Sequence, residues 1–294
     1  PYGYTFAPLM ARMTDTETLQ CATIGAGPGL FVEYAGSGEP VVFLHGVGGH
    51  RQDWYGQLPA FSGRYRALTW DARGYGRSGD YPGPATLDDF CGDLVQVLDH
   101  FDAQQAHVIG LSMGGFIAQE FCRAFPERVK SLVLAGTSKG FPAIFDDAWI
   151  EEFLRTRCEH LSNGLEIADI APKIVTALVS PSASPAVRER AIDSLVKLRK
   201  PVYIKTLAAI ARHRIQLDHG QVKVPTLILV GAGDQIMPPR ASVQLAEAIP
   251  GAELVILEGA GHLVNLEQPE RFNSTVLDFL DRHFPSQQRK RQAL

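Results

Sequence analysis

Short runs of apolar residues, bounded by glycine, proline or aspartate, recur along the 294-residue chain. They lie at Leu30–Tyr34, Val41–Leu44, Ala67–Trp70, His107–Ile109, Leu132–Ala135, Thr226–Val230 and Glu253–Leu257. Hydrophobicity that is continuous rather than alternating is typical of strands buried on both faces. Stretches with helical periodicity lie between or after these runs, at Leu87–Phe101, Met113–Phe125, Arg240–Ala248 and Pro269–His283. The alternation predicts a doubly wound, mostly parallel sheet flanked by helices.

The alternation stops once, between Thr137 and Val224, where the pattern is mainly helical. This stretch is far longer than an ordinary connection between a strand and a helix, so it must carry structure of its own. We expect a helical lid at 138–224, inserted between two parts of one core at 30–137 and 225–284. Residues 1–29 are expected to form an N-terminal extension, and residues 285–294 a solvated tail.

Composition narrows the choice of partners and location. The 28 basic and 32 acidic residues leave a net charge of −4, so no basic field exists to hold nucleic acid or an anionic membrane. No apolar run approaches the roughly 18 residues that span a bilayer. The four cysteines form no C-x-x-C pair, which argues against a zinc site and a disulfide framework. We therefore expect a soluble cytoplasmic protein with a small-molecule substrate and no metal; the oligomeric state is left open.

A candidate nucleophile lies at a predicted strand-to-helix turn. Ser112 is the centre of the sequence Gly110-Leu111-Ser112-Met113-Gly114, directly after one apolar run and directly before a helical pattern. In a G-x-S-x-G turn of this kind the serine is held in a strained backbone conformation with its hydroxyl exposed, and the flanking glycines let neighbouring segments approach. The alternative is a glycine-rich turn with an idle serine.

A serine hydroxyl needs a base, and the base needs an acid to hold its tautomer. Two later runs each end in a loop with one titratable residue: Asp234 follows Thr226–Val230, and His262 follows Glu253–Leu257. Because parallel strands end at the same edge of a sheet, we expect Ser112, Asp234 and His262 to converge there. Asp234 has a second interpretation, since an aspartate also caps the turn that contains it.

Acyl transfer also needs donors for the oxyanion. The run Val41–Leu44 is followed by the glycine-rich loop His45–Gly49, which can direct a backbone N–H at the serine. We predict the N–H groups of Val47 and Met113 as the pair, with His45 anchoring the loop. No cofactor is expected, because Gly25–Gly29 contains Pro28 and is followed by a strand pattern rather than the helix that a dinucleotide requires.

Five motifs in order resemble the α/β-hydrolase superfamily over Val41 to Phe284. They are the His45-Gly46 loop, the Asp71–Ser78 turn, the Gly110–Gly114 turn, the Gly233-Asp234 turn and Gly261-His262. The match looks closest to the 3-oxoadipate enol-lactonase and carboxylesterase group, through Leu111–Gly115 and Gly261–Pro269. The resemblance implies the α/β-hydrolase fold with an eight-stranded sheet, and a Ser-His-Asp triad. It argues against dehalogenases and epoxide hydrolases, which carry aspartate at the position of Ser112.

Substrate contacts are expected from the lid. Phe141, Phe145, Trp149 and Phe153 recur at a spacing of four, which is typical of one helix face. They either pack in a core or line an apolar pocket opposite Leu263. A carboxylate-bearing substrate would need a cation there, and Arg155, Arg157 and Lys205 are the nearest candidates. We expect a cofactor-free hydrolase of a small to medium ester or lactone. The alternatives are a C–C bond hydrolase of the meta-cleavage-product type, weakened by Leu263 where tryptophan is usual, and a slow ligand-binding receptor.

Overall fold

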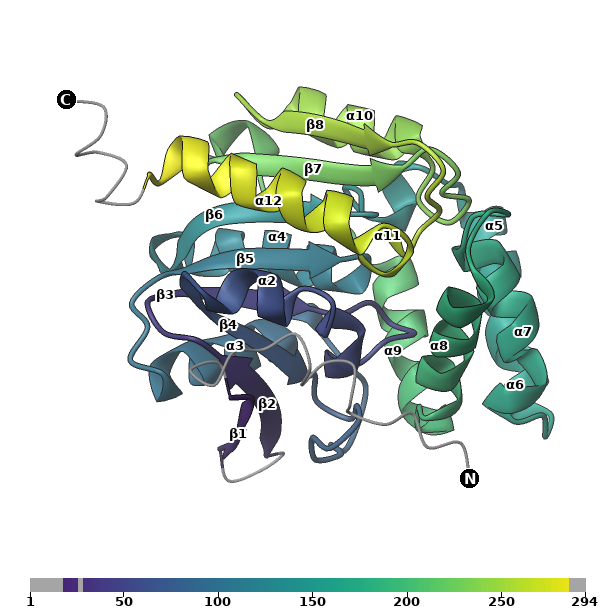
Figure 1. Cartoon of the computed structure of the whole chain (residues 1–294). Helices are drawn as coiled ribbons and strands as arrows, with labels where there is room; N and C mark the ends of the chain where they lie inside the picture. Colours follow the sequence, from purple (N-terminus) through teal and green to yellow (C-terminus); the bar gives the residue numbers. More distant parts are fainter. Residues whose placement is uncertain (1–17, 26–28, 286–294) are drawn as a thin grey trace.

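A computed structural model describes residues 18–25 and 29–285 (Figure 1). Eight strands form one sheet, in the spatial order β1-β2-β4-β3-β5-β6-β7-β8. They are β1 (Gln20–Ile24), β2 (Leu30–Ala35), β3 (Glu39–Leu44), β4 (Tyr65–Asp71), β5 (Ala106–Leu111), β6 (Val129–Ala135), β7 (Thr226–Gly231) and β8 (Glu253–Leu257). From β4 to β8 every neighbouring pair is parallel. The predicted fold class is confirmed, and all seven apolar runs are strands.

One strand, β1, lies in the stretch that we expected to form an N-terminal extension, on the far side of the Gly25–Gly29 segment from β2. β1 pairs antiparallel with β2, which in turn pairs antiparallel with β4. Most residues of β1 are exposed or half-buried, because an edge strand contacts the rest of the sheet on one side only. It therefore has no continuous apolar run. The remainder of the predicted extension, residues 1–17, and the predicted tail after Pro285 lie outside the described residues.

The sheet separates two hydrophobic cores, because successive residues of a strand point to opposite faces. Val42, Leu44 and Val108 face one core, and Val41, Phe43 and Ile109 face the other. The first core is covered by α3 (Leu87–His100), α4 (Met113–Ala124) and α10 (Pro239–Ala248), and the second by α2 (Leu58–Ser62) and α12 (Pro269–His283) (Figure 1). Burial on both faces explains why the strands appear as uninterrupted apolar runs.

A helical insertion connects β6 to β7, as the sequence pattern predicts. Its main helices are α5 (Asp147–Leu154), a π-helical turn at Arg155–Glu159, α6 (His160–Ser162), α7 (Ile167–Leu178), α8 (Pro185–Val196) and α9 (Lys200–Arg212). They gather beyond the carboxyl ends of the central strands, where the arrowheads point in Figure 1. The loops that follow β3, β5, β7 and β8 lie at this same edge, because these strands are parallel. Over the described ranges, no helix combines the length and the apolar character needed to cross a membrane.

Candidate active site

Ser112 lies at the sharp turn between β5 and α4. Its backbone has φ 55° and ψ −115°, and Asp102 is the one other non-glycine residue with a positive φ among the described residues. A positive φ costs about 1–3 kcal/mol and persists only where the surroundings enforce it. The Ser112 N–H donates to Ala135 O at the end of β6 (2.9 Å), which holds the turn in place. The strained turn that the motif predicts is therefore present.

The flanking glycines leave no room for a side chain. A Cβ on Gly110 would lie 2.2 Å from Gly114 O, and one on Gly114 would lie 2.1 Å from Leu44 O. These contacts let the first turn of α4 press against the ends of β3 and β5. The N-terminus of α4, with N–H groups that have no acceptor inside the helix, therefore lies beside Ser112.

His262 and Asp234 form a buried pair. His262 Nδ1 is 2.8 Å from Asp234 Oδ2, and both side chains are almost fully buried. Asp234 Oδ1 accepts from the N–H groups of Ile236 (2.9 Å) and Met237 (2.8 Å). Both interpretations of Asp234 thus hold, because one oxygen caps the turn and the other binds the imidazole. With the Nδ1 proton donated to Asp234, Nε2 is left free to accept a proton.

Ser112 and His262 line one cavity at this edge of the sheet, and Asp234 lies behind the imidazole. The cavity encloses about 790 Å³, its open mouth included. The core contributes the loop from His45 to Gly49, and the inserted helices contribute mostly apolar side chains such as Ile174, Leu195 and Leu207. Apolar walls with a few convergent polar groups are typical of small-molecule sites.

The loop predicted to form the oxyanion hole passes directly beside the serine. A Cβ on Gly46 would lie 3.3 Å from Ser112 Cβ and 3.8 Å from its Oγ. Val47 lines the cavity, and Met113 is the first residue of α4. His45 Nδ1 donates to Gly46 O (2.8 Å), and Nε2 accepts from Ala72 N (3.1 Å). One ring nitrogen thus donates and the other accepts, which requires the neutral ring, and burial lowers the pKa of His45 in the same sense. The ring anchors the loop to the segment after β4, as predicted.

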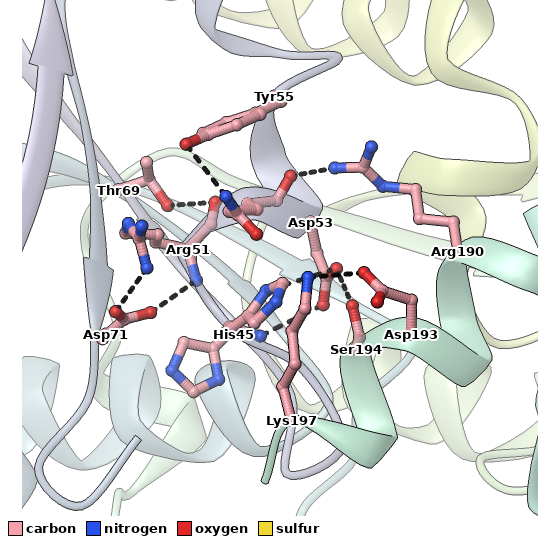
Figure 2. Close-up of polar contacts among 12 residues, drawn as sticks. His45, Arg51, Asp53, Tyr55, Thr69, Asp71, Arg190, Asp193, Ser194 and Lys197 are labelled. Carbon is pink, nitrogen blue, oxygen red and sulfur yellow. Dashed lines mark hydrogen bonds and ion pairs between the residues drawn. The ribbon is translucent and has the colours of Figure 1, made fainter. Parts of the chain in front are cut away.

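A polar network that the sequence did not indicate supports this loop (Figure 2). Arg51, in the short helix after the loop, donates through its backbone and its guanidinium to the Asp71 carboxylate at the end of β4 (3.0 and 2.7 Å). Asp53 in the same helix lines the cavity and accepts from His50 N (3.1 Å). From α8 of the insertion, Ser194 Oγ donates to Asp53 (2.5 Å) and Arg190 donates to Gln52 O. Helix α8 is thereby fastened to the residues that follow the loop.

The insertion also contacts the loop that carries His262. The His262 N–H donates to Leu178 O at the end of α7 (2.7 Å). The Glu267 carboxylate accepts from the N–H groups of Gly261 (3.0 Å) and Ser180 (2.8 Å), one on each side of the contact. Neither Glu267 nor Leu178 was predicted, since no motif marks a residue whose role is a backbone contact.

The predicted substrate contacts divide into two pairs. Phe141 and Leu263 line the cavity, whereas Phe145 and Trp149 are not among its lining residues. Phe145 and Trp149 stack on each other instead, with ring centroids 3.7 Å apart, and Trp149 is 36% exposed. Phe153, the next residue of the same spacing, lines the cavity. The two ends of the stripe, Phe141 and Phe153, therefore reach the cavity, whereas its middle residues, Phe145 and Trp149, do not.

Comparison with known proteins agrees with this architecture. Residues 39–269 match the family model described as alpha/beta hydrolase fold. Because the match spans most of the chain, the protein belongs to the α/β hydrolase family.

Curated relatives of similar length carry several hydrolase names. A putative carbamate hydrolase of Azorhizobium caulinodans is 29% identical, with 87% of this chain and 96% of that protein covered. A 2-hydroxy-6-oxononadienedioate/2-hydroxy-6-oxononatrienedioate hydrolase of Paraburkholderia phymatum is 29% identical (91% and 99% covered). A 3-oxoadipate enol-lactonase of Acinetobacter baylyi is 28% identical (80% and 86% covered).

Solved structures similar to this chain also include proteins described as hydrolases. A hydrolase from Pseudomonas aeruginosa is 30% identical with a TM-score of 0.77, over 90% of this chain and 98% of that one. A thermophilic esterase from Thermogutta terrifontis, in a malate-bound structure, is 28% identical with a TM-score of 0.78 over the same shares. The relatives named here share the α/β hydrolase fold, and their printed names differ in the bond that is cleaved.

Proposed function

We propose that this protein is a serine hydrolase that cleaves a carboxylic ester or lactone through an acyl-enzyme, without a cofactor. The observation that carries the proposal is the buried Asp234–His262 pair on the same cavity as Ser112, at a turn of strained backbone. Relatives named as lactonase and esterase support the choice of bond.

The proposed reaction starts with proton transfer. His262 Nε2 takes the Ser112 proton as Oγ attacks the carbonyl carbon, and Asp234 holds the imidazole and stabilises its charged form. The N–H groups of Val47 and Met113 donate to the oxyanion, which is worth about 3–4 kcal/mol for one donor of this kind. His262 then protonates the leaving alcohol, and a water molecule activated by the same residue hydrolyses the acyl-enzyme.

In this proposal the inserted helices act as a lid. They supply most of the apolar wall above Ser112, so a substrate enters between them and the sheet edge, and closure excludes water from the acyl-enzyme except at the reacting position. The apolar lining, which includes Phe141 and Leu263, favours a small to medium molecule. The four cysteines have free thiols, and a reducing cytoplasm is the location we propose.

The proposal is tested with an activated ester and a covalent probe. Ser112→Ala is expected to lower turnover of 4-nitrophenyl acetate by several orders of magnitude and to abolish labelling by a fluorophosphonate, with an unchanged circular dichroism spectrum. A Ser112→Ala variant as active as the parent contradicts the proposal. A parent that binds ligands but neither labels nor turns over indicates a receptor of the same fold.

A second candidate is hydrolysis of a C–C bond with the same residues, and the relative from P. phymatum favours it. Comparing turnover of different substrates distinguishes ester hydrolysis from C–C bond hydrolysis. If turnover of a vinylogous 1,5-diketone exceeds that of every ester, the C–C activity is the main one; the reverse order supports the esterase.

A further inference from the structure

We propose that Arg157 binds a carboxylate group of the substrate, so that the preferred ester or lactone carries a second, unreactive carboxylate. This inference rests on the proposed function and names its substrate class. Arg157 is the one lysine or arginine among the described residues that line the cavity shared by Ser112 and His262.

The surroundings of Arg157 hold its guanidinium in position without neutralising it. Its Cζ lies 5.1 Å from the centroid of the Phe153 ring, which also lines the cavity. A ring beneath a guanidinium leaves the in-plane N–H donors available. Tyr203, almost fully buried on the same cavity, lies within hydrogen-bonding reach of the guanidinium: burial raises the pKa of its hydroxyl, and the charge of Arg157 and its hydrogen bond oppose that rise. One donor of Arg157 is thus directed at Tyr203, which fixes the plane of the guanidinium, and the remaining donors are available to a ligand.

No carboxylate of the described chain forms an ion pair with Arg157. The nearby acids of its own segment, Glu152 and Glu159, pair with Arg155 (2.7 and 3.3 Å). Asp53, the one acidic residue that lines the cavity within the described part of the chain, accepts from Ser194 and from His50 N. Arg157 is only partly buried, so water solvates its charge in the free protein. A substrate carboxylate that displaces this water meets a guanidinium that no carboxylate of the described residues already neutralises.

The sequence offered three cations as candidates for binding a substrate carboxylate, and the structure shows which of them lines the cavity. Arg155 is 56% exposed at its side chain and lies outside the cavity lining. Lys205 donates to Tyr81 O (2.9 Å) and pairs with Asp80 (3.4 Å), away from the cavity. Side chains two positions apart on a helix point to nearly opposite sides, so Arg157 reaches the cavity whereas Arg155 points to solvent.

A guanidinium matches the geometry of a carboxylate, since two parallel N–H donors meet two oxygens. The rest of the lining is largely apolar, so the segment between the reacting carbonyl and the carboxylate is expected to be hydrocarbon. Half-esters of aliphatic dicarboxylic acids and lactones with an acidic side chain have this chemistry.

Two matched pairs of substrates test the inference. The first is mono(4-nitrophenyl) glutarate against 4-nitrophenyl valerate, and the second is 5-oxotetrahydrofuran-2-acetate against γ-caprolactone, followed in a pH-stat. In each pair a carboxylate replaces an alkyl end of similar size. The quantity compared is the ratio of kcat/KM for the acid to kcat/KM for its neutral partner.

The parent is expected to favour the acid of each pair, and Arg157→Gln is expected to lower the ratio by about 10- to 100-fold. Arg155→Gln removes an arginine two positions away that does not line the cavity, so it should leave the ratio unchanged. Arg157→Lys keeps the charge but not the paired donors, so its ratio should fall less. If Arg157→Gln does not fold, the fall in Arg157→Lys against Arg155→Lys decides the question.

Binding of glutarate by calorimetry separates this inference from the function on which it rests. Parent turnover with an equal ratio in Arg157→Gln overturns the role of Arg157 and leaves the serine hydrolase intact. A parent that hydrolyses none of the four substrates and does not label at Ser112 overturns the hydrolase. In that case, glutarate binding that is weakened at least tenfold in Arg157→Gln supports the anion site, and equal binding overturns it.

Discussion

Ser194 of helix α8 donates a 2.5 Å hydrogen bond to Asp53, a residue 141 positions earlier in the chain. Asp53 follows the loop His45–Gly49 and accepts from His50 N at the end of that loop. A Cβ on Gly49 would lie 2.4 Å from Asp53 Oδ2, so the carboxylate is in close contact with the loop backbone. One hydrogen bond therefore joins the inserted helices to the loop that passes beside Ser112.

Loss of this bond should weaken both the fold and the activity. Ser194→Ala leaves the buried Asp53 carboxylate with one donor fewer, and we expect a loss of about 1–3 kcal/mol in the free energy of unfolding. We also expect a lower kcat for 4-nitrophenyl acetate, since the loop loses support. Urea unfolding and steady-state kinetics measure the two effects.

The matched control for Ser194→Ala is Asp193→Asn on the same helix. Asp193 pairs with the half-exposed Lys197 at the surface, and exposed pairs contribute about 0–1 kcal/mol. The interpretation fails if Asp193→Asn lowers kcat as much as Ser194→Ala.

Asp234→Asn should separate the two roles of Asp234. The amide oxygen can still accept from Ile236 N and Met237 N, but an amide N–H facing His262 Nδ1 favours the wrong tautomer. A loss of roughly 10³- to 10⁴-fold in kcat is expected at pH 7, by analogy with other Ser-His-Asp enzymes, with little change in Tm. Asp218→Asn is the control, because Asp218 also caps a turn, through Gly220 N. Near-normal kcat in Asp234→Asn would contradict the assignment.

Replacing two helical glycines by alanine should change the stability of the protein in opposite directions. Gly114→Ala places a Cβ 2.1 Å from Leu44 O in the first turn of α4, so we expect a large loss of stability together with a displaced Ser112. Gly92, inside α3, has nothing within 4 Å of such a Cβ, and Gly92→Ala should raise stability by about 0.5–1 kcal/mol. Thermal unfolding of both variants checks the contrast; a stable, active Gly114→Ala protein would refute it.

Stability should fall in mild acid because of His107. Burial lowers the pKa of this histidine to about 4, Lys130 adds to the effect, and Glu39 opposes it. The ordinary pKa of histidine is about 6.5. Between pH 6.5 and pH 4 the unfolded chain binds a proton at His107 that the folded chain does not, so the free energy of unfolding falls by about 3 kcal/mol as the pH is lowered through this window. Above pH 6.5 the histidine contributes no pH dependence.

Urea unfolding between pH 4 and pH 7 measures this loss. His107→Asn should flatten the pH dependence by about one proton, even if it lowers stability at pH 7 through lost ring contacts with Tyr65 and Phe284. The exposed His160 supplies the control variant, His160→Asn. An unchanged slope in His107→Asn would exclude His107 as the cause.

The strands and the positions of Ser112, Asp234 and His262 were predictable because they depend on local patterns. A strand buried on both faces must be apolar at every position, and a residue that follows such a strand must lie at the sheet edge. The sequence alone therefore predicted that these three residues lie at one edge of the sheet, but it gave no distances between their side chains. β1 forms no apolar run because an edge strand has no such pattern; it was expected only as the strand before a turn at Gly25–Gly29, and its bounds came from the structure.

The cavity and its contacts were decided by tertiary structure. Arg155 and Arg157 lie two positions apart, and only the packing of the inserted helices beside the sheet edge decides that Arg157, rather than Arg155, lines the cavity. The contact between Asp53 and Ser194 joins segments that share no motif, and Phe145 and Trp149 follow the same spacing as Phe141 yet stack away from the site. Periodicity reports which side of an element is buried, whereas the partner that buries it depends on how distant segments pack.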